Sequence, residues 1–215
     1  EGLPFGLAGV FVTLYYRLGS VLVHSYAGAP SAAAYGIALR ILDATQVLPV
    51  SVNTVLLPKM SGGRTTPKIR QQVAITMAGI GVACSLTFHV AAPTVQELLV
   101  PSLPEFQVLL RTLGLAVPFI FLGYVLSTHA VVDKRGRSYL GIVAAASMGS
   151  LSSNVLLLPS GGAPITAGIA VAAEAFVSGG LIVVARSWGT YGLAYFIAAV
   201  PAAIALASHV FRSVS

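Results

Sequence analysis

The chain has 215 residues, of which 56% are hydrophobic and only 8% are charged, with a net charge of +6. A soluble domain carries roughly 25% charged residues, so the few charges here could not cover the surface of a soluble protein of this length. The positive charge would suit nucleic acid, but the basic residues are not clustered on a soluble face. We therefore expect an all-α integral membrane protein that takes no nucleic acid as a partner.

Seven apolar segments reach the length of about 20 residues that a bilayer-spanning helix needs. They lie at 3–27, 33–57, 71–92, 107–131, 139–158, 164–185 and 191–211. The breaks between them carry turn residues, in the runs GAPS at 28–31, PKMSGGRTTPK at 58–68, PSLPE at 101–105, DKRGRS at 133–138 and PSGGAP at 159–164. Pro49 and Pro118 lie inside two of the segments, where each removes a backbone hydrogen bond and favours a kink.

The connections alternate between basic and non-basic. The basic ones hold Lys59, Arg64, Lys68, Arg70, Lys134, Arg135, Arg137 and Arg186. The alternate connections (28–31, 93–106 and 159–163) hold no Lys or Arg. Because basic loops stay on the cytoplasmic side, the first segment is expected to start inside and the seventh to end outside, at Arg212.

The chain begins with Glu1 and enters its first apolar segment by Leu3, so we expect it to be a piece of a longer protein. Because the seventh segment is expected to end outside, either a second cut at the C-terminus or a naturally missing final helix is expected there. Its single cysteine, Cys84, lies in an apolar run and offers no disulfide or thiolate metal site. No metal-ligand spacing, phosphate loop or nucleophile elbow is present. We therefore expect a protein that is not an enzyme and that has no cofactor or metal.

Polar residues recur at helical spacing inside several apolar segments. The stripes are Thr13, Arg17, Ser20 and His24; Gly36, Arg40, Asp43, Gln46 and Asn53; Ser147, Ser150 and Asn154; and Glu174 and Ser178. A charge in a lipid-facing helix costs at least about 2.5–3.5 kcal/mol, so the charged members are expected to face protein or a watery cavity. At 1.5 Å per residue, Arg17, Arg40 and Glu174 fall at similar depth.

Structural explanations compete with this cavity. Small and hydroxylated residues in membrane helices usually pack or form weak interhelical hydrogen bonds. Arg40 and Asp43 are three residues apart and could neutralise each other as a structural pair. Glu174 is equally well explained by a hydrogen bond to a neighbouring helix and by a cavity-facing acid.

Two stretches carry a family resemblance. LPFGLAGVFVTLYYRLGSVLV and AAYGIALRILDATQVLPVSVNTVLLPKMS are followed, in order, by the basic turn at 134–137, Asn154, Gly161-Gly162 and Glu174. Over residues 3–190 this order resembles the C-terminal half of Wzx-like polysaccharide flippases, in the MOP superfamily that also holds the multidrug and toxic-compound (MATE) extruders. Gly19 stands where those proteins commonly carry an acid.

The resemblance implies a transporter of two six-helix lobes around a central cavity, located in the cell membrane as a multi-pass protein. Residues 1–190 would form the C-terminal lobe (helices 7–12), residues 191–215 an additional transmembrane helix, and the missing N-terminal lobe would be the partner. The substrate would be a polyprenyl-pyrophosphate-linked oligosaccharide, moved across the cytoplasmic membrane by alternating access among membrane lipids. The implied substrate contacts are Arg17 and Arg40 for pyrophosphate and Tyr16 and Tyr35 for sugar. The polar stripes add Asp43, Gln46, Asn154 and Glu174 as cavity candidates.

Three other functions remain open. A multidrug or cation antiporter of the same superfamily would need titrating acids, for which Asp43 and Glu174 are the candidates. A membrane polymerase or ligase would need large outer loops, whereas the largest here, 93–106, offers only Glu97 and Glu105. A purely structural membrane subunit is the last.

Overall fold

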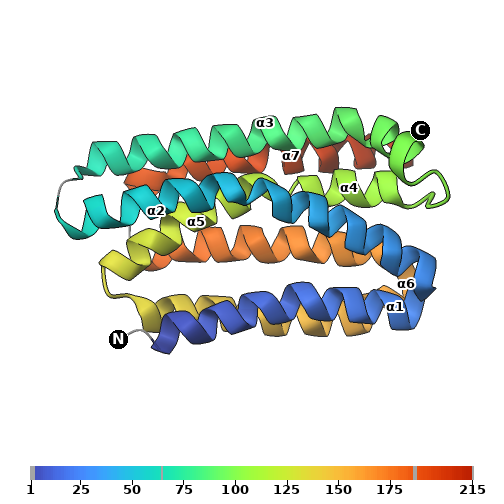
Figure 1. Cartoon of the computed structure of the whole chain (residues 1–215), viewed down its shortest axis with the longest axis horizontal. Helices are drawn as coiled ribbons and strands as arrows, with labels where there is room; N and C mark the ends of the chain where they lie inside the picture. The colour runs from blue at the N-terminus through green and yellow to red at the C-terminus, as the bar shows by residue number, and fades with distance from the viewer. Residues whose placement is uncertain (1–2, 64, 186–187, 215) are drawn as a thin grey trace.

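The computed structural model describes residues 3–63, 65–185 and 188–214, and every regular element in these ranges is a helix (Figure 1). The helices are α1 (Leu3–Thr45), α2 (Val47–Ser61), α3 (Pro67–Leu99), α4 (Phe106–Gly114), α5 (Val117–Val132), α6 (Gly136–Ala185) and α7 (Trp188–Val214). The predicted all-α class is confirmed for the described residues.

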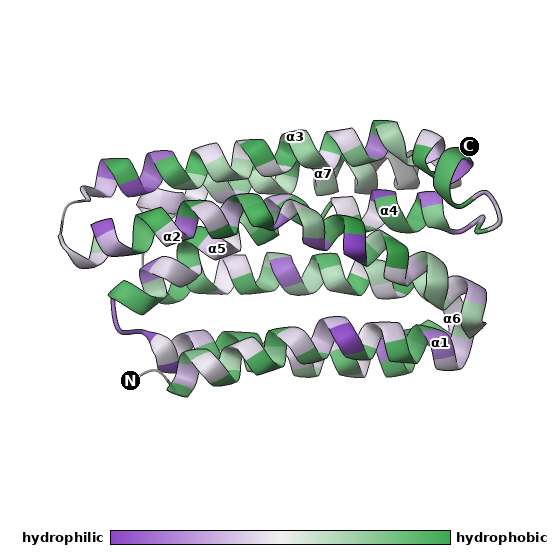
Figure 2. Cartoon of the chain, in the orientation of Figure 1, coloured by the Kyte–Doolittle hydropathy of each residue, from purple (hydrophilic) through white to green (hydrophobic). Residues whose placement is uncertain are grey.

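Within the described ranges, four helical stretches are long and apolar enough to cross a membrane, namely Leu3–Ser61, Pro67–Leu99, Phe106–Val132 and Gly136–Val184. Their outward faces are apolar as well, since Val90, Leu98 and Leu156 are 80%, 74% and 75% exposed. Figure 2 shows hydrophobic residues along all the helices, with hydrophilic positions interrupting both halves of α1. Contiguous apolar surface of this kind suits contact with lipid, which supports a membrane-embedded protein.

Helices α1 and α6 each fold back on themselves at a single glycine (Figure 1). Gly28 has φ 85° and ψ 175°, and Gly162 has φ 66° and ψ −164°. This backbone region is accessible almost solely to glycine. Both glycines are followed by Ala-Pro, and Pro30 and Pro164 fall in the first turn of the returning arm, where a missing N–H costs little. The first and second arms are therefore 3–27 and 29–45 in α1, and 136–161 and 163–185 in α6.

The two prolines expected to kink helices interrupt them instead. Helix α1 ends at Thr45, because Pro49 has no N–H to donate a hydrogen bond to the carbonyl of Thr45. The chain forms a tighter turn there, in which Gln46 N donates to Asp43 O at 3.0 Å. Pro118 likewise has no N–H for Gly114, where α4 ends. The chain continues in nearly the same direction at both places, as Figure 1 shows.

The connections are shorter than the sequence predicts. Helix α3 continues through Pro93 to Leu99, so the predicted connection at 93–106 is wrong in extent and shrinks to 100–105. Proline is a weaker helix breaker in an apolar bundle, because neighbouring groups satisfy the freed carbonyl. The break predicted at 58–68 also narrows, since α2 reaches Ser61 and Thr66 caps α3 by accepting a hydrogen bond from Ile69 N at 3.3 Å.

The basic and non-basic connections lie at opposite ends of the bundle (Figure 1). The link from α2 to α3 and the link at 133–135 share one end. The reversals at Gly28 and Gly162 share the other end with the link at 100–105. Arg64 and Arg186 lie outside the described residues, and the side chain of Arg212 is likewise not described.

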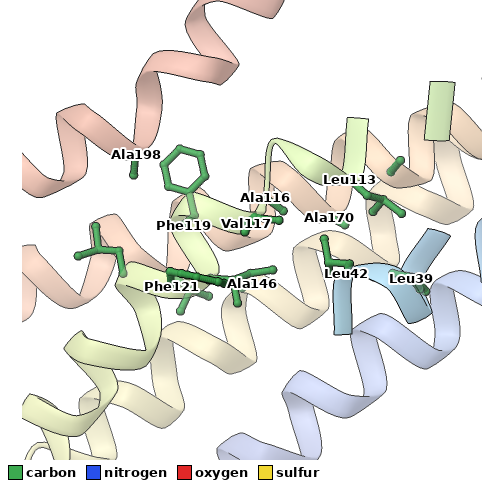
Figure 3. Close-up of a cluster of buried hydrophobic side chains, with 14 of the residues drawn as sticks. Leu39, Leu42, Leu113, Ala116, Val117, Phe119, Phe121, Ala146, Ala170 and Ala198 are labelled. Atoms are coloured by element: carbon green, nitrogen blue, oxygen red, sulfur yellow. The ribbon is translucent and has the colours of Figure 1, made fainter. Parts of the chain in front are cut away.

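The core is a layer of leucines, aromatics and alanines between the helices. Figure 3 labels members of this buried cluster from five helices, among them Leu39 and Leu42 of α1, Leu113 of α4, Phe121 of α5, and Ala146, Ala170 and Ala198 of α6 and α7. The alanines let the helices approach closely, because apolar helices in lipid gain their association energy largely from close packing. The first arm of α1 packs along α6, while α3 packs on α5 and α7.

Gly81 of α3 marks the closest approach in this core. A Cβ added there would lie 2.6 Å from the Cα of Pro118, where backbone leaves no room for adjustment. We predict that Gly81→Ala lowers the free energy of unfolding by about 1–3 kcal/mol through overpacking. Gly79→Ala is the control, because its Cβ would meet nothing within 4 Å. Unfolding in detergent micelles measures both, and equal stability of the two variants would contradict the close packing.

Candidate functional site

Glu174 is a buried carboxylate held by two tyrosines from a neighbouring helix. It lies on the second arm of α6 and is 8% exposed. Its Oε1 accepts a hydrogen bond from the hydroxyl of Tyr16 at 2.7 Å and another from the hydroxyl of Tyr15. The two tyrosine rings stack with their centroids 4.4 Å apart. The first arm of α1 is thus joined to α6 by a polar contact inside an apolar bundle.

A cavity of about 200 Å³ opens beside this carboxylate, and we call it the tyrosine cavity. It is formed by the first arm of α1, the break after α1, helix α5 and both arms of α6. Its lining consists of Gly9, Val12, Tyr15, Tyr16, Gln46, Ile120, Gly123, Tyr124, Ser127, Tyr139, Glu174 and Val177. Tyrosines therefore supply most of its hydroxyl groups.

A second hydrogen-bonded chain includes two other residues that line this cavity. The hydroxyl of Tyr124 donates to Gln46 Oε1 at 2.8 Å, and Gln46 Nε2 donates to Asp43 Oδ1 at 3.1 Å. Asn53 Nδ2 fixes the same part of α5 by donating to the carbonyl of Tyr124 at 2.8 Å. The cavity is thereby connected through an amide to the exposed carboxylate of Asp43.

Arg17, Arg40 and Asp43 form an exposed polar face on the two arms of α1. The positive charge of Arg17 acts on the carboxylate of Asp43. Among the described side chains, Arg70 and Asp133 form an ion pair, with Nη1 and Oδ1 3.7 Å apart. Arg40 and Asp43 do not make such a pair, so the structural pairing considered from their spacing is not formed. Asp43 instead accepts a hydrogen bond from Gln46 Nε2 at 3.1 Å.

Asn154 is placed apart from the other sequence-predicted residues. It lies on the first arm of α6, is 3% exposed, and its Nδ2 donates to the carbonyl of Ser150 at 2.9 Å within its own helix. It does not line the tyrosine cavity. Gly19 is also removed from the polar face, because it is buried and a Cβ there would lie 3.3 Å from side-chain atoms of Thr166 and Tyr35.

Glu174 combines the two explanations that its sequence context left open. It accepts hydrogen bonds from a neighbouring helix, and it also lines a cavity. The polar stripes of the sequence do not include Tyr15, Tyr124 and Tyr139, because tyrosine counts as a hydrophobic residue. The signal that could have found them is the concentration of phenols in segments that also carry charges.

Among the described residues, no three His, Cys, Asp or Glu side chains gather as a metal site would require. No protein-family model matches the chain, and no curated protein or solved structure matches it either. The geometry of the polar groups therefore carries the functional argument.

The tyrosine cavity is smaller than the 300–1,000 Å³ typical of pockets that enclose a drug-sized ligand. A whole lipid-linked sugar would not fit inside it. Its phenols, amide and carboxylate suit hydrogen bonds to hydroxyl groups or to a small polar species.

The contacts of Glu174 can be tested by removing one phenol at a time. We predict that Tyr15→Phe and Tyr16→Phe each lower the free energy of unfolding by about 1–3 kcal/mol, because each leaves a buried acceptor with one partner fewer. Tyr26→Phe is the matched control, since Tyr26 is 54% exposed. Unfolding in detergent followed by circular dichroism measures the effect. Stability unchanged in both buried variants would show that Glu174 does not depend on these tyrosines.

Proposed function

We propose that this chain is one lobe of a flippase that moves a polyprenyl-pyrophosphate-linked oligosaccharide across the cytoplasmic membrane by alternating access. The observation that carries the proposal is the exposed polar face of Arg17, Arg40 and Asp43 beside the tyrosine cavity. Several charges at mid-span on one face of an otherwise apolar helix do not suit contact with lipid. Transporters of this kind bind their substrates near the bilayer midplane, between repeats or lobes.

The cost of exposing charge to hydrocarbon supports a polar face that is covered by protein or water. Each charge exposed to hydrocarbon would cost at least about 2.5–3.5 kcal/mol. The three side chains are exposed on the described bundle, so protein or water would have to cover them in a membrane. An N-terminal lobe facing the arms of α1 would enclose a water-filled cavity there. That lobe is the partner that the proposal requires.

The chemistry of the polar face fits a pyrophosphate. Guanidinium groups bind phosphate oxygens through a planar fork of N–H donors, and Arg17 and Arg40 supply two of them from different arms of α1. Tyr16 and Gln46 border the adjacent cavity, where their polar tips suit sugar hydroxyls. Asn154 lies outside this cluster and is not part of the proposed site.

The positions of the chain reversals favour seven transmembrane segments. The arms on either side of Gly28 and Gly162 are each long enough to cross a bilayer by themselves when α2 is counted with the second arm of α1. Helices α4 and α5 form one crossing interrupted near Pro118. In this scheme residues 1–190 form the lobe, and residues 191–215 the additional helix, which packs on α3 and α5.

A multidrug or cation antiporter of the same superfamily is the second candidate. The observation in its favour is that Glu174 lines the tyrosine cavity and that a second carboxylate, Asp43, is hydrogen-bonded to the lining residue Gln46. Buried acids in membrane bundles often mark ion pathways. A polymerase or ligase is less well supported, because the described connection between α3 and α4 is limited to 100–105.

The proposed orientation predicts which connections react from outside the cell. In a Cys84→Ala background, Ala29→Cys and Ser102→Cys are expected to react with a membrane-impermeant maleimide on intact cells. Gly62→Cys and Arg137→Cys, at the basic end, should react only after permeabilisation, because basic connections remain cytoplasmic. Labelling of both pairs in intact cells would contradict the orientation.

The pyrophosphate role predicts the effect of removing either guanidinium. We expect Arg17→Ala and Arg40→Ala in the complete protein to reduce export of surface polysaccharide by roughly 10- to 100-fold. This corresponds to a charge-assisted hydrogen bond of about 1.5–3 kcal/mol, at about 1.4 kcal/mol per tenfold. Lys59→Ala, which removes a charge from the exposed end of α2, is the control.

Export that survives both arginine variants would refute the pyrophosphate role. The antiporter would then be distinguished by Glu174→Gln, which should abolish drug or cation efflux while Arg17→Ala leaves it intact. Immunoblots of the membrane fraction must show equal amounts of each variant for these comparisons.

A further inference from the structure

A second cavity, separate from the polar face, lies at the basic end of the bundle. It measures about 330 Å³ and is bordered by the link before α3, the ends of α5 and α6, the link at 133–135 and the start of α7. Its polar lining includes Thr65, Arg70, His129, Asp133, Arg135 and Tyr191. Tyr139 borders both this cavity and the tyrosine cavity.

The charged groups around this cavity leave an excess of one positive charge. Arg70 and Arg135 contribute guanidinium groups, and Asp133 contributes one carboxylate, whose Oδ1 lies 3.7 Å from Arg70 Nη1. Arg135 also donates to the backbone carbonyl of Val184, which anchors it at the end of α6. Two guanidiniums facing one carboxylate retain hydrogen-bond donors for an anion.

Buried polar atoms without partners gather at the same place. Thr65 Oγ1, Arg70 Nε and His129 Nδ1 are buried and make no hydrogen bond within the described structure, and all three residues line the cavity. Buried polar groups in native proteins are nearly always hydrogen-bonded, so such a concentration points to an absent polar occupant. Arg70 Nε–H can only donate, so that occupant must offer an acceptor.

His129 can act as a second donor in one of its two neutral tautomers. Its side chain is 4% exposed and stacks on Tyr191 with ring centroids 5.0 Å apart. The hydroxyl of Tyr191 lies 3.4 Å from His129 Nε2. When that hydroxyl donates to Nε2, the neutral ring carries its proton on Nδ1. Guanidinium, imidazole and hydroxyl donors around one cavity are a suitable set for the oxygens of a phosphate.

We propose that this cavity binds a phosphate group at the cytoplasmic end of the bundle. Basic pockets between membrane helices on the cytoplasmic side commonly hold anionic headgroups. Leu126, Leu181 and Val184 line the remainder of the cavity and would suit the glycerol and first methylenes of a phospholipid. A free phosphate has the same oxygens without the apolar part. The proposal does not rest on the flippase function.

The test measures binding to the complete purified protein in detergent. Dioleoyl phosphatidylglycerol is added in increasing amounts and its binding is followed by native mass spectrometry. Inorganic phosphate is added in the same way, and its binding is followed by the increase in the thermal unfolding temperature. We expect the wild type to bind at least one of the two, and Arg70→Gln to weaken that binding by roughly 10- to 100-fold, as expected for a lost charge-assisted contact. Arg137→Gln is the matched control, because it removes an equal charge from the same end without lining the cavity.

A second variant guards against misfolding of the first. Ser138 lines the cavity and is exposed, so Ser138→Trp should fill the cavity while leaving both arginines in place. It is expected to abolish binding with little loss of thermal stability. Binding of phosphatidylglycerol alone would identify a lipid site, and binding of inorganic phosphate as well would identify a general phosphate site. Absence of both, binding that survives Ser138→Trp, or an equal loss in Arg137→Gln would overturn the proposal.

Discussion

The backbone of a membrane-embedded chain has to satisfy its own hydrogen bonds, and this constraint explains most of the fold. Almost every described residue lies in a helix, and two of the chain reversals are reduced to one glycine each. Gly28 and Gly162 are used because their backbone angles exclude a Cβ. Pro30 and Pro164 then begin the returning arms at positions where no donor is needed. The bundle can therefore turn within its apolar surroundings while exposing few backbone groups.

Hydrogen-bonded polar side chains lie close to the places where proline interrupts the helices. Gln46 lies at the break imposed by Pro49 and connects Tyr124 to Asp43. On the other side, Ser178 Oγ donates to the carbonyl of Phe119 at 2.9 Å, directly after the break at Pro118. Side-chain hydrogen bonds between helices thus lie close to both breaks. The prolines act as determinants of the candidate site as well as of helix direction.

The sequence predicts the helical class and the positions of the breaks, because apolar length and Gly-Pro content act locally. It misplaces the end of α3, because tolerance of Pro93 depends on the packed surroundings. Charge at depth also identifies Arg17, Asp43 and Glu174, since burial of charge is costly anywhere in a span. By contrast, the isolation of Asn154 and the convergence of Arg70 with His129 depend on which segments become neighbours. Neither is encoded in a single helix.

A chain reversal made by a single glycine cannot accommodate an inserted or deleted residue. A longer loop could absorb an inserted or deleted residue, but an insertion next to Gly28 would rotate the second arm of α1 by about 100° relative to the first. Asp43 would then leave the side on which Arg17 acts on it, although neither side chain had changed. Length variation should therefore be strongly selected against at the Gly-Ala-Pro turns and tolerated at the ends of the basic links. The number of residues between the two arms of α1 therefore determines the geometry of the site, as its side chains do.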